Sequence, residues 1–165
     1  MKRIKENLDA IVLDTLNVKA EQILKIGEGA WHTVYKLKRV DDQDLVIRIK
    51  KNEAYGELQQ IDEQELMTEY ESTKAYYLHA NKSNQNVCPN FYQYFIEKDL
   101  VFTVETFMGN GTDLLLLNQD QTHSYGTKLG RIFHRIHNQK TSIAGFGELH
   151  WQGETLRGSD SKKQG

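Results

Sequence analysis

The sequence contains one cysteine and one proline, which are the neighbours Cys88 and Pro89. A single cysteine excludes a disulfide within the chain, and the adjacent proline favours a turn, so we interpret Cys88 as a structural residue. The sequence also lacks any apolar run that approaches the roughly 20 residues of a membrane-spanning helix. These absences predict a soluble protein with no disulfide framework and no membrane partner.

An excess of positive charge is also missing. Lysine and arginine number 21 against 23 aspartates and glutamates, which gives a formal net charge of -2. Domains that coat nucleic acid usually carry a basic excess or stripe, so we expect no nucleic-acid partner and favour small-molecule chemistry. Residues 1–17 contain no uninterrupted apolar core and no small-residue cleavage site, so they do not read as a signal peptide and predict a cytoplasmic location.

Hydrophobic periodicity predicts alternating groups of helices and strands. Apolar residues at 8, 11, 12 and 16 lie on one helical face, and residues 1–21 are interpreted as an N-terminal helical extension. Alternation and β-branched residues predict strands in a hairpin over 22–40 and at 45–50, 90–96 and 100–105. Helical spacing recurs over 61–80 and 124–137. The fold class is therefore α+β.

The stretch IGEGAWHTVY, residues 26–35, places Gly27 and Gly29 between two predicted strands. Glycine lets the backbone approach a ligand closely and adopt positive φ values, so this loop is suited to cover phosphates. A hairpin turn without a ligand uses glycine for the same conformational reasons. The loop alone therefore leaves both interpretations open.

Cations follow the loop at a spacing that places them on one side of a strand. Val46, Arg48 and Lys50 share one face of the strand at 45–50, opposite its apolar residues. The next helix carries three glutamates that either pair with such a cation or face solvent: Glu65, Glu69 and Glu71. A cation beside a glycine loop strengthens the phosphate interpretation.

With these features the sequence from about residue 23 to 157 resembles the protein-kinase-like fold, and most closely small-molecule kinases of the aminoglycoside phosphotransferase and choline kinase type. Gly27, Gly29 and Val34 fit the G-x-G-x-x-G-x-V pattern, and His32 stands in place of the third glycine. The resemblance implies a nucleotide-binding lobe over 22–108, with a five-stranded antiparallel sheet and one long helix. It also implies that 109–157 begins an incomplete C-terminal lobe, followed by a loose polar tail over 158–165.

The resemblance also implies roles for individual residues. Val46 and Arg48 take the places of the alanine and lysine of the V-A-I-K strand, so Arg48 is the first candidate for binding phosphate and Lys50 the alternative. Glu69 best matches the glutamate that pairs with this cation. The hinge that reads adenine through its main chain, with Val104 behind it, is assigned to three residues: Glu105, Thr106 and Phe107. The nucleotide implied is ATP, with GTP as an alternative.

The catalytic loop of this fold, H-x-D-x-x-x-x-N or its H-G-D relatives, is not found. None of four histidines is followed by an aspartate two positions later: His123, His134, His137 and His150. Gly145-Phe146-Gly147 cannot bind Mg²⁺ through its first residue and is interpreted as a turn. We therefore assign no catalytic or metal-binding residue and expect these 165 residues not to transfer phosphate. Mg²⁺ belongs to the complete family protein.

Three functions remain open. The first is the ATP-binding lobe of a small-molecule kinase, which would phosphorylate a hydroxyl acceptor only where a complete C-terminal lobe exists. The second is a non-catalytic kinase-like binding or regulatory module. The third is an interaction module that self-associates through an exposed lobe interface. The identity of the acceptor is not contained in the sequence.

Overall fold

A computed structural model describes residue 16 and residues 20–40, 42–58, 62–83, 86–97, 100–111, 114–141, 143–153 and 155–160. The chain divides into two compact units, Met1–Ile61 with Phe91–Phe107, and Asp62–Asn90 with Met108–Gly165. The predicted α+β class is confirmed. The N-terminal helix expected over 1–21 lies almost wholly outside the described residues, and of its apolar positions only Leu16 is described.

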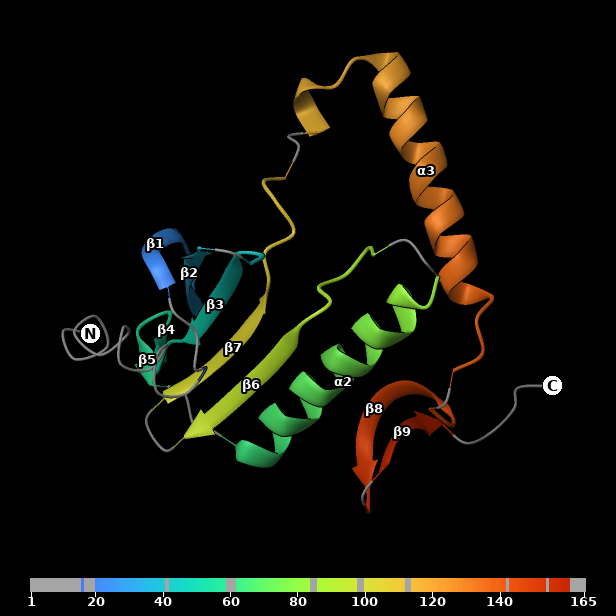
Figure 1. Ribbon diagram of the computed structural model, residues 1–165. Helices are drawn as coiled ribbons and strands as arrows, with labels where there is room; N and C mark the ends of the chain where they lie inside the picture. The colour runs from blue at the N-terminus through green and yellow to red at the C-terminus, as the bar shows by residue number, and fades with distance from the viewer. Residues whose placement is uncertain are drawn as a thin grey trace. The chain divides into compact units, whose positions relative to one another are not determined.

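Unit 1 is built on a five-stranded antiparallel sheet with the strand order β1-β2-β3-β7-β6 (Figure 1). The strands are β1 Ala20–Glu28, β2 His32–Arg39, β3 Leu45–Lys50, β6 Tyr92–Glu97 and β7 Leu100–Thr106. Strands are confirmed in all four predicted ranges, which are 22–40, 45–50, 90–96 and 100–105. Each predicted end lies within two residues of the observed one. The third strand therefore pairs on one side with the glycine-loop hairpin and on the other with β7.

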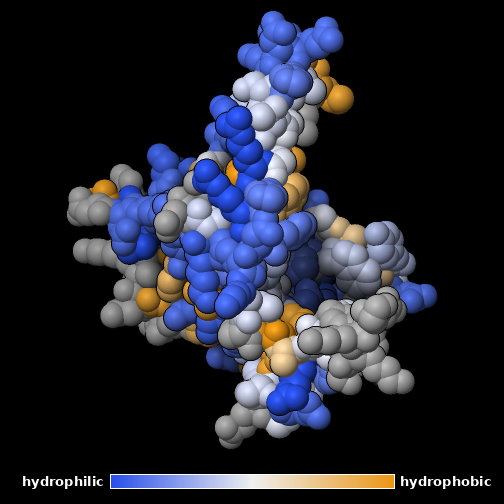
Figure 2. Space-filling model, turned by 90° about the vertical axis from the view of Figure 1, so that its right-hand side faces the viewer, coloured by the Kyte–Doolittle hydropathy of each residue, from blue (hydrophilic) through white to orange (hydrophobic). Residues whose placement is uncertain are grey.

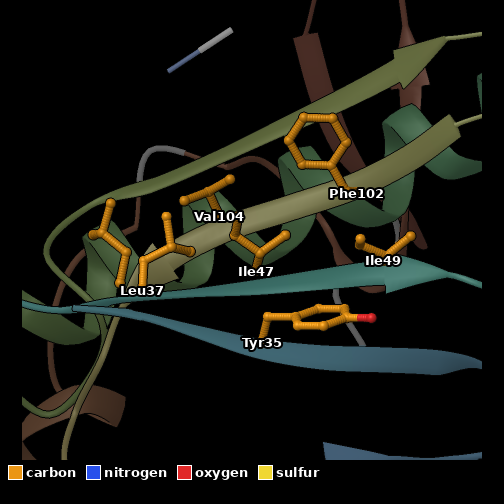
Figure 3. Close-up of a cluster of buried hydrophobic side chains, with 7 residues drawn as sticks. Tyr35, Leu37, Ile47, Ile49, Phe102 and Val104 are labelled. Carbon is orange, nitrogen blue, oxygen red and sulfur yellow. The ribbon is translucent and has the colours of Figure 1, made fainter. Parts of the chain in front are cut away.

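The core of unit 1 lies on one face of this sheet, because alternate residues of each strand point to the same side. Seven buried residues form the cluster: Tyr35, Leu37, Leu45, Ile47, Ile49, Phe102 and Val104. Figure 3 shows their side chains gathered along β2, β3 and β7. Phe95 of β6 stacks on Phe102 with ring centroids 4.6 Å apart, and Leu16 also packs against the cluster. Arg48 and Lys50 lie on the opposite face of the same sheet.

A second hairpin in unit 1 was not expected from the sequence, which predicted a polar loop over 52–60. Strands β4 Glu53–Ala54 and β5 Glu57–Leu58 pair with each other. Tyr55 and Gly56 at the tip have φ values of 55° and 81°, as the two central residues of a type I′ turn require. A positive φ is unfavourable for a bulky residue such as Tyr55.

Unit 2 contains the two long helices, α2 Glu63–Asn81 and α3 Gln119–His137. Asp62 caps α2 by accepting a 3.0 Å hydrogen bond from the Glu65 N–H. Asn118 caps α3 in a reciprocal capping box with Gln121, which begins this helix five residues earlier than predicted. The two helices meet at their C-terminal ends, where His79 Nε2 lies 3.1 Å from the Ile136 carbonyl oxygen.

Much of the apolar stripe of α3 faces solvent. Tyr125, Leu129 and Phe133 are all about half exposed, whereas Ile136 is buried. Figure 2 shows one face of the molecule, on which hydrophobic residues lie in small separate groups among hydrophilic ones. No helix within the described ranges combines the length and the apolar character needed to cross a membrane.

The last described element is a hairpin of β8 Phe146–Gln152 and β9 Thr155–Asp160, and β8 contacts α2. The sequence predicted a turn at Gly145–Gly147 and a loose tail from residue 158, whereas β9 continues through Gly158 to Asp160. The Gly158 N–H donates a 2.9 Å hydrogen bond to the Ala144 carbonyl oxygen. Backbone pairing holds residues 158–160, so their lack of apolar side chains was a poor guide, whereas the rest of the predicted tail, 161–165, lies outside the described residues.

Candidate functional site

The glycine loop is a short connection between β1 and β2. Gly29, Ala30 and Trp31 lie between the strands, and the Gly29 N–H donates a 2.9 Å hydrogen bond to the His32 carbonyl oxygen. The N–H groups of Ala30 and Trp31 have no backbone acceptor within the described part of the chain. Two main-chain donors at the loop tip can therefore be offered to an anion.

Neither glycine of this loop is required by the conformation of the hairpin. Gly27 and Gly29 are absent from the residues with positive φ, whereas Gly56 and Gly153 have φ values of 81° and 64°. A Cβ on Gly27 would lie 3.8 Å from the Val34 Cβ, and one on Gly29 would lie 3.9 Å from the His32 carbonyl oxygen. Both distances are ordinary van der Waals contacts. The turn-based explanation of these two glycines is therefore not supported.

The register of the sheet places Gly27 in line with the predicted cation. Gly27 pairs with Val34, Val34 pairs with Arg48, and Arg48 pairs with Thr103 of β7. Directly paired residues point to the same face of a sheet. A Cβ at position 27 would therefore project on the face that carries Arg48, and its absence leaves this face open beside Val34.

Arg48 is bound by a glutamate that sequence reasoning assigned to the hinge. Its Nε and Nη2 donate hydrogen bonds of 2.9 and 2.7 Å to Glu105 Oε1. The Glu105 side chain is 8% exposed and that of Arg48 is 45% exposed, so a buried carboxylate holds a guanidinium group that still reaches solvent. Two of the five guanidinium N–H groups are used, which leaves three for another acceptor.

The pairing of Arg48 with Glu69 remains a prediction. Glu69 lies on α2 in unit 2, together with the reserve candidates Glu65 and Glu71, whereas Arg48 belongs to unit 1. The Arg48–Glu105 pair joins residues 57 positions apart in the sequence and depends on the pairing of β3 with β7. Sequence alone held no signal for this register, so Glu105 was assigned a main-chain role only.

His32 and Lys50 form the part of this face next to the loop. They are directly paired between β2 and β3, and the Lys50 ammonium lies 5.5 Å from the centre of the Trp31 ring. Partial burial lowers the pKa of His32 from its ordinary 6.5, and the nearby charges of Lys50 and Arg48 lower it further. The loop therefore adjoins three basic side chains, which are those of His32, Lys50 and Arg48.

An ion-pair cluster fixes both ends of the loop. Glu28 accepts bonds from Lys25 and Lys51, and the Lys51 N–H donates a 2.8 Å bond to the Trp31 carbonyl oxygen. Hydrogen bonds from Lys25 and then Lys51 lower the pKa of Glu28 to about 2. Trp31 also meets Tyr55 edge-to-face at 5.8 Å. The sequence analysis missed Glu28 and Tyr55, although Glu28 lies between the two glycines.

The predicted hinge has main-chain donors that are already engaged within unit 1. The Thr106 N–H donates a 3.1 Å bond to the Phe91 carbonyl oxygen, and the Phe107 N–H donates a 2.8 Å bond to the Asp44 carbonyl oxygen. The Lys36 ammonium pairs with the Asp44 carboxylate at 2.9 Å and lies 3.9 Å from the centre of the Phe107 ring. An adenine that uses either N–H must replace one of these bonds.

Val104 and Val46 occupy opposite faces of the sheet. Val104 pairs with Ile47 and is fully buried in the core cluster, whereas Val46 pairs with Glu105 on the side of Arg48. The sequence analysis placed Val104 behind a nucleotide pocket. In the structure Val104 packs in the core cluster, and its place behind a nucleotide pocket stays a prediction. The β7 residue on the side of Arg48 is Glu105.

Within the described ranges, the structure contains no group of three or more histidine, cysteine, aspartate or glutamate side chains that could hold a metal ion. His134 and His137 lie on the exposed part of α3, where the His137 ring stacks on Phe133. Comparison with protein-family models and with curated proteins found no match for this chain.

Proposed function

We propose that unit 1 binds the phosphates of a nucleotide, ATP first, between the glycine loop and the Arg48 face of the sheet. It would serve as the nucleotide-binding lobe of a small-molecule kinase of the aminoglycoside phosphotransferase type. The observation that carries this proposal is that the hairpin does not require Gly27 or Gly29, although Gly27 is in line with Arg48. Gly27 lies at an irregularity of the β1–β2 pairing but has no positive φ, and a ligand that lies over this row supplies a further reason for glycine.

The order of the sheet supports the same assignment. A glycine loop joins the first two strands, the candidate cation lies on the third, and the predicted hinge lies at the end of the strand that pairs with it. This arrangement agrees with the resemblance to kinase-like proteins on which the site residues were assigned.

The binding energy should come mainly from the phosphates. Arg48 offers three remaining N–H groups, Lys50 an ammonium, and the loop two main-chain donors. A hydrogen bond to a charged group contributes about 1.5–3 kcal/mol. At the other end, the N–H groups of Thr106 and Phe107 already have acceptors. We therefore expect ATP and GTP to bind with similar affinity.

The proposal is limited to binding. The catalytic aspartate and the Mg²⁺ ligands of phosphoryl transfer were not assigned to any residue of this sequence. Transfer to a small-molecule hydroxyl would depend on residues that are not part of these 165. The acceptor class is therefore proposed only for a complete family protein.

Isothermal titration of ATP into the wild type and two variants tests the proposal. Arg48→Met removes the charge but keeps much of the side-chain length, and we expect the affinity to fall about tenfold to a hundredfold because a charge-assisted hydrogen bond is lost. Arg39→Met is the matched control, since Arg39 is on the same sheet but pairs with Asp42. Equal losses in both variants would indicate a general effect of charge and contradict the site.

A second candidate is an interaction module that self-associates through α3. Tyr125, Leu129 and Ile132 follow the alternating four- and three-residue spacing of a helix–helix seam, and the first two are about half exposed. A second copy of α3 would cover such a stripe. Sedimentation over a range of concentrations should then show a rising mass that Leu129→Gln lowers, whereas a constant monomer mass would exclude this candidate.

A further inference from the structure

The residue that replaces the third glycine of the kinase pattern lies inside the proposed phosphate site. His32 pairs directly with Lys50 across β2 and β3, and residue 34, two positions further along the same strand, pairs with Arg48. Residues two apart on a strand share a face, so His32, Lys50 and Arg48 lie on the same side. The His32 side chain is partly buried and follows the loop tip directly.

The charges around His32 come from three strands. Lys50 and Arg48 approach from β3, and Arg48 is bound to Glu105 of β7. On β1, Glu28, which pairs with Thr33, is already held by Lys25 and Lys51. Burial lowers the pKa of His32 below its ordinary 6.5, and the charges of the two β3 cations, Lys50 and Arg48, lower it further. His32 is therefore mostly neutral at pH 7 without a ligand.

We propose that His32 is a third phosphate-binding group of this site, and that it takes up a proton when an oligophosphate binds. This inference rests on the proposed function. The anion would neutralise Arg48 and Lys50, which are the charges that oppose protonation, and would add negative charge beside the ring. Protonated histidine then donates hydrogen bonds from both ring nitrogens, of which the Nε2 or Nδ1 group nearer the phosphate supplies one.

The sign of the pH dependence follows from this linkage. Binding raises the pKa of His32, so the affinity increases as the pH falls through the value of the bound state. It reaches a plateau below the value of the unbound state. A rise of about one pKa unit on binding corresponds to about tenfold tighter binding at the lower plateau.

The experiment measures oligophosphate affinity at pH 5.5 and pH 8 in the wild type and in His32→Gln, because glutamine keeps a hydrogen-bonding side chain that does not titrate in this range. Trimetaphosphate is the probe, since its charge does not change between these two pH values. We expect tighter binding at pH 5.5 than at pH 8 in the wild type, by up to about tenfold for a rise of one pKa unit, and a ratio near one in His32→Gln. His123→Gln, on α3, is the matched control and should keep the wild-type ratio.

The outcomes separate this inference from the proposed function. If neither trimetaphosphate nor ATP binds at either pH, the nucleotide site itself is contradicted. If both bind but the wild-type affinity for trimetaphosphate is the same at both pH values, or the ratio persists in His32→Gln, then His32 is not the protonated group. A titration of the His32 ring followed by NMR, with and without trimetaphosphate, gives an independent readout. An unchanged pKa in that titration would also overturn the inference.

Discussion

Replacing Gly27 by alanine should affect the stability of the fold and the affinity for a nucleotide in opposite directions. The added Cβ would lie 3.8 Å from the Val34 Cβ and 4.0 Å from its Cγ2, and Gly27 is not among the positive-φ residues. Alanine in a strand is favoured over glycine by about 0.5–1 kcal/mol, so we expect the variant to be slightly more stable than the wild type. For a chain of 165 residues this corresponds to a rise in Tm of about 1–4 °C.

The same methyl group should weaken nucleotide binding, because it projects on the face where the phosphates are proposed to lie. We expect ATP affinity to fall at least about tenfold, measured by calorimetry alongside a thermal unfolding curve. Gly153→Ala is the matched control: its φ of 64° makes alanine unfavourable by about 1–2 kcal/mol, and it lies in the other unit. That variant should melt lower and bind normally. Normal binding by a stable Gly27→Ala variant would refute the reasoning.

Three further changes test individual contacts. Arg48→Met should lower the free energy of unfolding by about 1–2 kcal/mol, because it leaves the buried Glu105 carboxylate without this partner, and a double-mutant cycle with Glu105→Gln measures the coupling. In acid, Glu28 contributes stability that is fully present above pH 4.5 and is lost as the pH falls toward its native pKa of about 2. Glu28→Gln should therefore flatten this part of the stability profile, and an unchanged profile would contradict the ion-pair cluster. Tyr55→Asn should raise stability by about 1 kcal/mol in chemical denaturation, because asparagine tolerates the positive φ of this turn; a loss would mean that the contact with Trp31 outweighs the strain.

The strands of unit 1 were the most predictable part of the fold, because their residues alternate. Ile47 and Ile49 enter the core while Arg48 faces the other side, and this pattern is visible in the sequence. The short β4–β5 hairpin was missed because each of its strands has two residues, too few for a periodic signal. Its one usable signal was the Tyr55–Gly56 pair at the turn.

The start of α3 and the partner of Arg48 were missed for different reasons. Asn118 and Gln121 form a capping box that is present in the sequence. The residues that follow it are polar, so apolar periodicity predicts a helix start only where the apolar stripe begins, several residues later. Glu105, in contrast, meets Arg48 only because of the register between β3 and β7. No local pattern encodes such a long-range pairing, so that part of the site needed the structure.

Nucleotide binding observed through Trp31 tests the central proposal most directly, because this side chain lies at the loop tip, is 42% exposed and contacts both Lys50 and Tyr55. In a Trp151→Phe background the remaining tryptophan fluorescence comes from Trp31 alone. We expect a saturable change on titration with ATP up to about 1 mM or a few-fold higher, where a Kd of 1 mM corresponds to about -4 kcal/mol. The change should be absent or strongly shifted in Arg48→Met. A flat signal in the wild type, together with no heat of binding in calorimetry, would contradict the proposal.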